Sequence, residues 1–164
     1  EAVGGQAFVF KVNAKQSTQV DVNSIANSLR NDLRLEISAN LLAVDAKDNM
    51  VIIRFISPIL FGSGSSVVEP AALPEVNKLV NAIAQYASQV WVVGHTDSTG
   101  KADSNWVISR KRAEAIAQWL KQASIQLPNT ITRAAADTQP LVPNTSEHNR
   151  SLNRRVELKL VLKG

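Results

Sequence analysis

The feature that most restricts the fold of this chain is a short apolar run, Val90 to Val93, with a helical pattern on each side of it. A continuous run of this length and composition is typical of a central strand that is buried on both faces. One helix is expected to begin at Pro70, because proline is well tolerated in a first turn, and a second is expected over residues 105–122. Their core-facing positions are Leu73, Val76, Val80 and Ile83 in the first helix, and Ala113, Ile116, Ala117 and Leu120 in the second. The chain therefore needs a sheet against which both helices pack.

Further strands are expected before and after this unit. Residues 41–44 and 50–56 are apolar, β-rich runs joined by a polar turn over residues 45–49, which predicts a hairpin. Another short strand begins at Ile131, and residues 156–162 alternate between the two faces of a strand. Residues 137–151 between them are polar and rich in turn-forming residues. The order strand, helix, strand, helix, strand, strand predicts an α+β sandwich in which two helices cover one face of a mixed sheet.

The first fifty residues form an extension to this unit. Residues 8–12 alternate with a period of two, which predicts a short strand. A capping-type cluster at residues 21–24 leads into apolar residues at helical spacing, and this helix is expected to end near Leu35. We therefore divide the chain into an N-terminal strand-and-helix extension, residues 1–50, and a single domain over residues 51–164.

Composition narrows the class of protein and of partner. Eighteen Lys and Arg against fourteen Asp and Glu give a net charge of +4, which attracts anionic polymers of any kind, nucleic acid or cell-wall glycan. A dedicated nucleic-acid binder concentrates more charge and interleaves it with aromatic residues, which are only 5% here, so no nucleic acid is expected as a partner. The chain has no cysteine, and no apolar run approaches the ~18 residues of a membrane span. Because the first residue is Glu1, we expect a processed protein or a soluble part of a longer one.

Two polar residues, His95 and Asp97, follow the central strand at the edge where ligands commonly bind in α/β sheets. A hydrolase would need a nucleophile, but neither Ser98 nor Thr99 lies in a Gly-x-Ser-x-Gly turn. A metal site would need a third ligand at a defined spacing, and His148 is the only other imidazole. We expect no catalytic residue, no metal and no cofactor here, and a structural role for His95.

Asp97 and Arg112 form a more informative pair. They are fifteen residues apart, and Arg112 lies in the first two turns of the following helix, so the crossover can bring the start of the helix to the end of the strand. A carboxylate and a guanidinium held side by side suit a zwitterionic ligand, whose ammonium and carboxylate they would take respectively. The alternative is an internal salt bridge that joins loop to helix and contributes ~0–1 kcal/mol when exposed. The spacing leaves both interpretations of this pair open. Two interpretations also remain for residues 153–155, which are either a solvated basic start of a strand or further hydrogen-bond donors for an anion.

Taken together, these motifs resemble the OmpA-like peptidoglycan-binding domain. Residues 94–100, Gly-His-Thr-Asp-Ser-Thr-Gly, are followed by Asn105 and by Ser109-x-x-Arg112-Ala113, as in the family's T-D-x-x-G, Asn and L-S-x-x-R-A pattern. The closing P-x-x-x-N and N-R-R-V-E motifs of the family are similar to Pro140 with Asn144 and to residues 153–157. The resemblance covers about residues 53–162. Departures are Ile108 in place of Leu, and Ala134 and Ala136 where many members carry Gly.

The resemblance implies a βαβαββ fold and a binding function without catalysis. In the family, the Asp and the Arg of these motifs hold the diaminopimelate residue of the peptidoglycan stem peptide, and they correspond here to Asp97 and Arg112. Diaminopimelate carries an ammonium beside a carboxylate, which is the ligand that the pair suits. By the same resemblance, Asn105 shapes the groove, and Asn153 and Arg154 contribute at its wall.

Residues 61–65 and 104–106 look like the MotB-type branch of this family, which also includes anchors of type VI secretion. MotB-like proteins are inner-membrane subunits of ion-driven complexes, with one membrane helix before the wall-binding domain. The resemblance thus implies a periplasmic domain that works as a homodimer with an ion-conducting partner subunit, and residues 1–50 would join membrane to wall domain. A MotB-like subunit of type I secretion, of the SiiA kind, is compatible too, whereas the insert common in flagellar stators is absent. The alternatives are an outer-membrane anchor of the OmpA or Pal type and an assembly domain that has lost wall binding.

Overall fold

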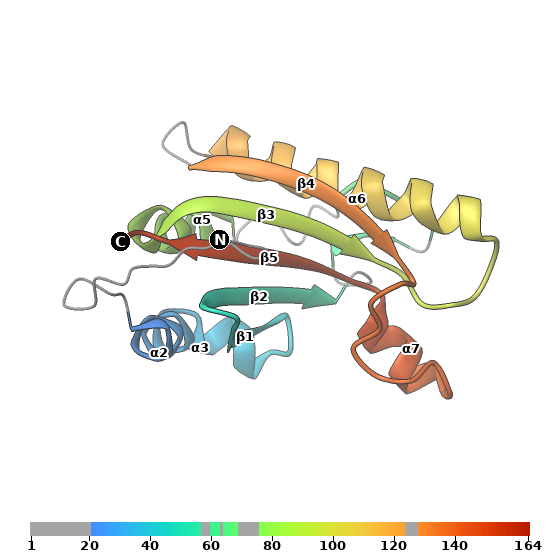
Figure 1. Ribbon diagram of the computed structural model, residues 1–164, viewed down its shortest axis with the longest axis horizontal. Coiled ribbons are helices and arrows are strands. Elements are labelled where there is room, and N and C mark those ends of the chain that lie inside the picture. Colours follow the sequence, from blue (N-terminus) through green and yellow to red (C-terminus); the bar gives the residue numbers. More distant parts are fainter. Residues whose placement is uncertain (1–20, 57–59, 63, 69–75, 124–127) are drawn as a thin grey trace.

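The computed structural model describes residues 21–56, 60–62, 64–68, 76–123 and 128–164. Its centre is a five-stranded sheet in the order β1-β2-β5-β3-β4 (Figure 1). The strands are β1 (Leu42–Lys47), β2 (Met50–Ile56), β3 (Ala87–His95), β4 (Asn129–Ala136) and β5 (Arg155–Leu162). Because β3 and β4 are parallel and the other neighbours are antiparallel, the sheet is mixed, as predicted.

Five helices accompany the sheet in the described part of the chain. They are α2 (Val22–Asp32), α3 (Arg34–Ser38), α5 (Val76–Tyr86), α6 (Ala102–Ala123) and α7 (Glu147–Asn153). The long helix α6 packs on β3 and β4, α5 lies beside α6, and α2 packs on β1 and β2. The short helix α7 lies beyond the end of the sheet at which β3 and β4 finish (Figure 1).

One face of the sheet forms the core with α2, α5 and α6. The strand period of two points Val51, Val92 and Leu158 toward these helices, where they are buried together with the predicted stripe of α6. The opposite face carries charged residues, since Arg54 pairs across the strands with Glu157 in register. From β2 onward the described elements follow the predicted βαβαββ order with one addition, the short helix α7 between β4 and β5, and the α+β sandwich is confirmed.

The hairpin and the last connection differ from the sequence predictions. The turn between β1 and β2 is only Asp48 and Asn49, both at positive φ (54° and 61°), a two-residue turn that matches the twist of the strands. Residues 45–47, predicted as turn, therefore belong to β1. The polar segment 137–151 was predicted as turns alone, but it contains the start of α7, whose N-cap Ser146 accepts a hydrogen bond from the Asn149 N–H.

The N-terminal extension shares the core of the sheet. The predicted strand at residues 8–12 and the predicted helix start at Pro70 lie outside the described residues. The capping cluster behaves as predicted, because the Asp21 carboxylate accepts from two backbone N–H groups at the start of α2. Leu29 and Leu33 are buried in the same cluster as the strands, and Lys78 of α5 donates to the buried Glu36 at 3.0 Å. The predicted boundary at residues 50 and 51 lies within the hairpin, so residues 21–56 pack as one body with the rest.

Each edge strand of the sheet has an arginine on one of its carbonyl oxygens. Arg30 of α2 donates through Nε to the Val44 carbonyl of β1 at 3.0 Å. Arg133 donates through Nη1 to the Thr132 carbonyl of β4 at 2.9 Å, and its guanidinium also lies over the Trp91 ring. Within the described residues, no helix combines the length and the apolar character needed to span a membrane.

Candidate functional site

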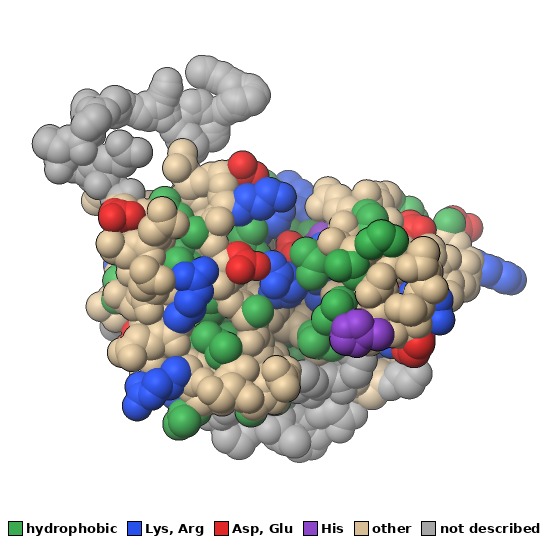
Figure 2. Space-filling view, turned by 90° about the horizontal axis from the view of Figure 1, so that it is seen from below, with side chains coloured by type: hydrophobic (Ala, Val, Ile, Leu, Met, Phe, Trp, Pro, Cys, Tyr) green, Lys and Arg blue, Asp and Glu red, His purple; other side chains and the backbone are tan. Residues whose placement is uncertain are grey.

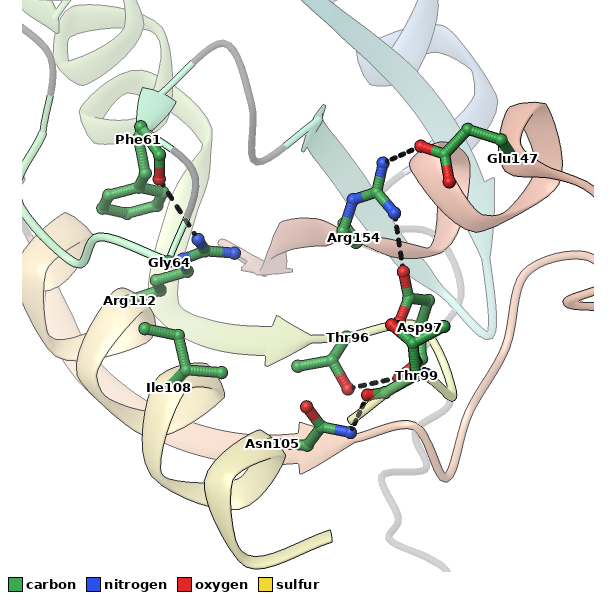
Figure 3. Close-up of a pocket in the computed structure, with 11 residues that line it drawn as sticks. Phe61, Gly64, Thr96, Asp97, Thr99, Asn105, Ile108, Arg112, Glu147 and Arg154 are labelled. Atoms are coloured by element: carbon green, nitrogen blue, oxygen red, sulfur yellow. Dashed lines mark hydrogen bonds and ion pairs between the residues drawn. The ribbon is translucent and has the colours of Figure 1, made fainter. Parts of the chain in front are cut away.

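A pocket of about 610 Å³ opens at the end of the sheet where β3 finishes and β5 begins (Figure 3). This volume lies in the range of small-ligand sites. Its walls come from the segment before α5, the β3–α6 loop, the first half of α6, and both ends of α7. The lining residues are Phe61, Gly62, Gly64, Thr96, Asp97, Thr99, Asn105, Ile108, Arg112, Glu147 and Arg154. Four of the five predicted site residues, all except Asn153, are among them.

Asp97 lies directly after β3 and is only 4% exposed. Its Oδ1 accepts from the Thr99 backbone N–H at 2.8 Å and from the Thr99 hydroxyl, and its Oδ2 accepts from Arg154 Nη1 at 2.6 Å. Burial by itself raises the pKa of this carboxyl, but the hydrogen bonds from Thr99 and then Arg154 outweigh burial and leave the pKa lowered. Asp97 is therefore an ionised carboxylate with a fixed orientation.

Arg112 lies on α6, on the other side of the pocket from Arg154 (Figure 3). Its Nε donates to the Ser65 carbonyl at 2.9 Å, its Nη2 reaches the Gly62 carbonyl at 3.5 Å, and the guanidinium lies 5.2 Å from the centroid of the Phe61 ring. None of these partners is charged, and no ion pair joins Arg112 to a carboxylate of the described residues. Burial, and secondarily the charge of Arg154, lower the pKa of Arg112. A buried cation held only by neutral groups offers a place for an anion.

The structure bears on one of the two interpretations of the Asp97 and Arg112 pair, the internal salt bridge. Both side chains line the pocket, yet the ion pair of Asp97 is with Arg154 rather than with Arg112. Arg154 Nη2 is also 2.6 Å from Glu147 Oε2, so its guanidinium joins two carboxylates. The four charged groups of the pocket sum to zero, which suits a ligand end that carries one charge of each sign.

The close packing of α6 on β3 brings the two halves of the pocket together. A Cβ atom placed on Gly94 would lie 2.0 Å from the Ser109 carbonyl oxygen, so only glycine allows this approach. Asn105 ties the start of the helix to the loop, because its Nδ2 donates to the Thr99 carbonyl at 2.9 Å. At the end of β4, Ala136 has a φ of +49°, in the left-handed region that glycine prefers, at a position where the sequence departs from the Gly of many family members.

Asn153 does not line the pocket. It is fully buried; its Oδ1 accepts from the Leu141 and Val142 N–H groups, and its Nδ2 donates to the Val142 carbonyl and to Asn144 Oδ1. These four bonds use the full hydrogen-bonding capacity of an Asn amide. Asn153 therefore shapes the segment that carries Glu147, and no donor or acceptor of its side chain is left for a ligand.

Arg155 and Glu157 attach the same segment to the charged face of the sheet. Arg155 donates to the Gln139 carbonyl at 2.9 Å and to Glu157 at 2.8 Å. Glu157 also pairs with Arg54, and its Oε1 lies 3.4 Å from Nε2 of the buried His95. Burial lowers the pKa of His95, and Glu157 opposes this only in part. His95 lies outside the pocket lining, and among the described residues no group of three or more His, Cys, Asp or Glu side chains is arranged to hold a metal ion.

The sequence interpretation missed three contributors to the pocket. The sequence assigned residues 61–65 no contact with the pocket, yet Phe61 is buried, pairs with Val68 in a β-bridge, and lies against Arg112. Glu147 had no motif to mark it, although its place directly after the capping Ser146 is a helix-start signal. Thr99, considered only as a nucleophile, orients Asp97.

A two-layer α+β domain with a charge-balanced pocket at the end of its sheet defines a ligand-binding module. The chain belongs to the OmpA family, because the model of that family matches residues 60–154, more than half of the chain. A second model, structure-specific recognition protein (SSRP1), matches residues 1–78, less than half of the chain, and assigns no family.

Curated relatives agree with this membership. Outer membrane porin F of Pseudomonas fluorescens is 35% identical over 108 residues, which is 65% of this chain and 33% of that protein. The probable lipoprotein YiaD of Escherichia coli is 26% identical over 129 residues, 78% of this chain and 59% of that protein. The peptidoglycan-binding protein ArfA of Mycobacterium tuberculosis is 28% identical over 102 residues, 62% of this chain and 31% of that protein. The chain thus matches between about a third and three fifths of the length of these relatives.

Solved structures share the fold over most of the chain. The cell wall anchor of the type VI secretion system from Pseudomonas aeruginosa superposes with a TM-score of 0.75 and 27% identity, covering 82% of this chain and 97% of that one. The periplasmic domain of Helicobacter pylori MotB superposes with a TM-score of 0.66, covering 75% of this chain and 83% of that one; at 21% identity it shows likeness of fold.

Proposed function

We propose that this chain binds peptidoglycan non-covalently and without turnover, by holding the free amino-acid end of a diaminopimelate residue. The observation that carries the proposal is the buried guanidinium of Arg112, which no carboxylate of the described residues neutralises, in one pocket with the carboxylate of Asp97. Arg112 takes the ligand carboxylate, and Asp97 takes the ammonium. Asn105 holds the loop that carries Asp97. The names of two similar proteins, a peptidoglycan-binding protein and a cell wall anchor, support this ligand.

We further propose that binding anchors an inner-membrane, ion-driven complex of the MotB type to the wall. In this arrangement the chain is a periplasmic domain, it works as a homodimer, and a membrane subunit that conducts protons or other ions is its partner. The fold shared with MotB periplasmic domains and with the type VI anchor supports this proposal. An outer-membrane anchor is the second candidate, favoured by the similarity to outer membrane porin F. Membrane fractionation of the full-length protein distinguishes them, since an outer-membrane location would contradict the first.

Sedimentation with purified sacculi tests wall binding. Arg112→Ala and Asp97→Asn should each weaken binding about ten- to a hundredfold, because a hydrogen bond to a charged group contributes ~1.5–3 kcal/mol. Arg110→Ala and Asp103→Asn, on the exposed side of the same helix, are the matched controls and should bind like the parent. Thermal unfolding checks that every variant is folded. Equal sedimentation of Arg112→Ala and the parent would refute the assignment, and a parent that stays in the supernatant would favour an assembly domain without wall binding.

A further inference from the structure

The carboxylate that should receive the ligand ammonium already holds a cation of the chain itself. Arg154 Nη1 lies 2.6 Å from Asp97 Oδ2, and Thr99 fills the two positions on Oδ1. An ionised carboxylate has about four acceptor positions. The remaining position is on Oδ2, directly beside the guanidinium.

An ammonium in that position would meet a like charge. Asp97 is almost fully buried, and charges interact more strongly in such surroundings than in bulk water. The ligand can therefore use Asp97 well only when Arg154 moves away from it. Arg154 has room to do so, since its side chain is 27% exposed.

Glu147 offers Arg154 a second partner that does not depend on Asp97. It accepts from Nη2 at 2.6 Å, a different nitrogen from the one that Asp97 uses. It stands at the first position of α7 and its side chain is 68% exposed, so it can follow the guanidinium without disturbing the core. Figure 3 shows Arg154 between these two acidic groups, with Arg112 across the pocket. On the face seen in Figure 2, acidic and basic side chains are intermixed.

We propose that Arg154 is a built-in competitor for Asp97, and that Glu147 is the positioning residue that retains Arg154 when the ligand displaces it. This rests on the proposed function of the pocket and adds how its affinity is set. In the empty pocket Arg154 neutralises Asp97 and holds it in place. In the occupied pocket the ligand ammonium replaces Arg154 on Asp97, Arg112 receives the ligand carboxylate, and Arg154 stays on Glu147. The competition lowers affinity and keeps each single attachment to the wall reversible.

Calorimetric titration with a soluble diaminopimelate-containing muropeptide tests the proposal on the parent, Glu147→Gln, Arg154→Gln and the double variant. Arg154→Gln should bind about fivefold more tightly, because the competitor is gone. Glu147→Gln should bind about two- to fivefold more weakly, because Arg154 then has Asp97 as its main partner. In the double variant the Glu147 substitution should have no effect, since a zwitterionic end without net charge hardly responds to a remote charge. Glu114→Gln, the same change at an exposed position of α6, should match the parent.

The outcomes separate this inference from the proposed function. A parent that does not bind the muropeptide refutes the proposed function. A parent that binds while Arg154→Gln binds more weakly makes Arg154 a ligand contact and overturns the competitor role. An equal effect of Glu147→Gln with and without Arg154 also overturns it. If Arg154→Gln does not fold, Glu147→Gln still decides, because its exposed site tolerates the change and unaltered affinity would refute the proposal.

Discussion

The substitution Gly94→Ala tests the close packing of α6 on β3, because it adds one methyl group between the two elements. The new Cβ would lie 2.0 Å from the Ser109 carbonyl oxygen and 2.8 Å from its carbonyl carbon. Ordinary contact begins at 3.4 Å, so the strand and the helix must separate by about 1.4 Å. The obstacle is backbone, and no side-chain rotation relieves it. Overpacking of this kind costs about 3 kcal/mol or more, and α6 would carry Arg112 away from Asp97.

For a chain of this length, such a loss lowers Tm by about 6–12 °C. Circular dichroism at increasing temperature measures the change in stability, and sedimentation with sacculi measures binding, which should fall by about tenfold or more where the protein remains folded. Gly164→Ala, whose added Cβ meets no atom within 4 Å, is the control. Ser109→Gly in the Gly94→Ala background should not rescue, because the clash is with the main chain. A Gly94→Ala protein with the parent's Tm and binding would refute the close packing of strand and helix.

Two further predictions concern the network around the pocket. Because burial lowers the pKa of His95 while an unfolded His titrates near 6.5, His95 binds its proton less readily in the folded state, so the free energy of unfolding should fall as pH drops below about 6.5. His95→Gln should reduce the dependence of Tm on pH between about pH 7 and 5. His148→Gln, at an exposed position, is the control and should keep the dependence of the parent. A parent-like dependence in His95→Gln would contradict the reasoning. Asn153→Ala should cost about 2–3 kcal/mol in urea unfolding, because two backbone N–H groups lose their acceptor. Asn149→Ala should lower the free energy of unfolding much less. Equal losses in the two variants would contradict the role of the buried Asn153 amide as the acceptor for these N–H groups.

Much of the fold could be predicted because its signals are local. The alternation in β5 and the apolar stripe of α6 repeat over seven or more residues, and the structure confirms both elements. The helix α7 could not be found this way, since only one of its seven residues, Leu152, is apolar and no apolar period is present. The turn between β1 and β2 was predicted over too many residues, because polar residues were used to define it. Only Asp48 and Asn49 have the positive φ that the turn requires.

The site residues also fall into those that a local motif predicts and those that only the packing of distant segments reveals. Asp97 and Arg112 were found because both belong to one short motif around a strand-to-helix crossover. The pairing of Asp97 with Arg154 links residues 57 positions apart in the sequence, and no spacing rule reaches that far. Asn153 belongs to the same closing motif as Arg154, yet its amide faces the opposite way, into the segment at residues 141–144. A motif indicates which residues matter together, whereas packing decides which of them meets the ligand.

The arginines on the two edge strands bear on how copies of the domain can lie close together. Proteins held on a common polymer experience a high local concentration, and open strand edges would then invite copies to join into continuous sheets. Arg30 and Arg133 each occupy one carbonyl oxygen of an edge strand, in β1 and β4, the two edges of the described sheet. A strand that adds to either edge would therefore first have to displace an arginine from a carbonyl oxygen.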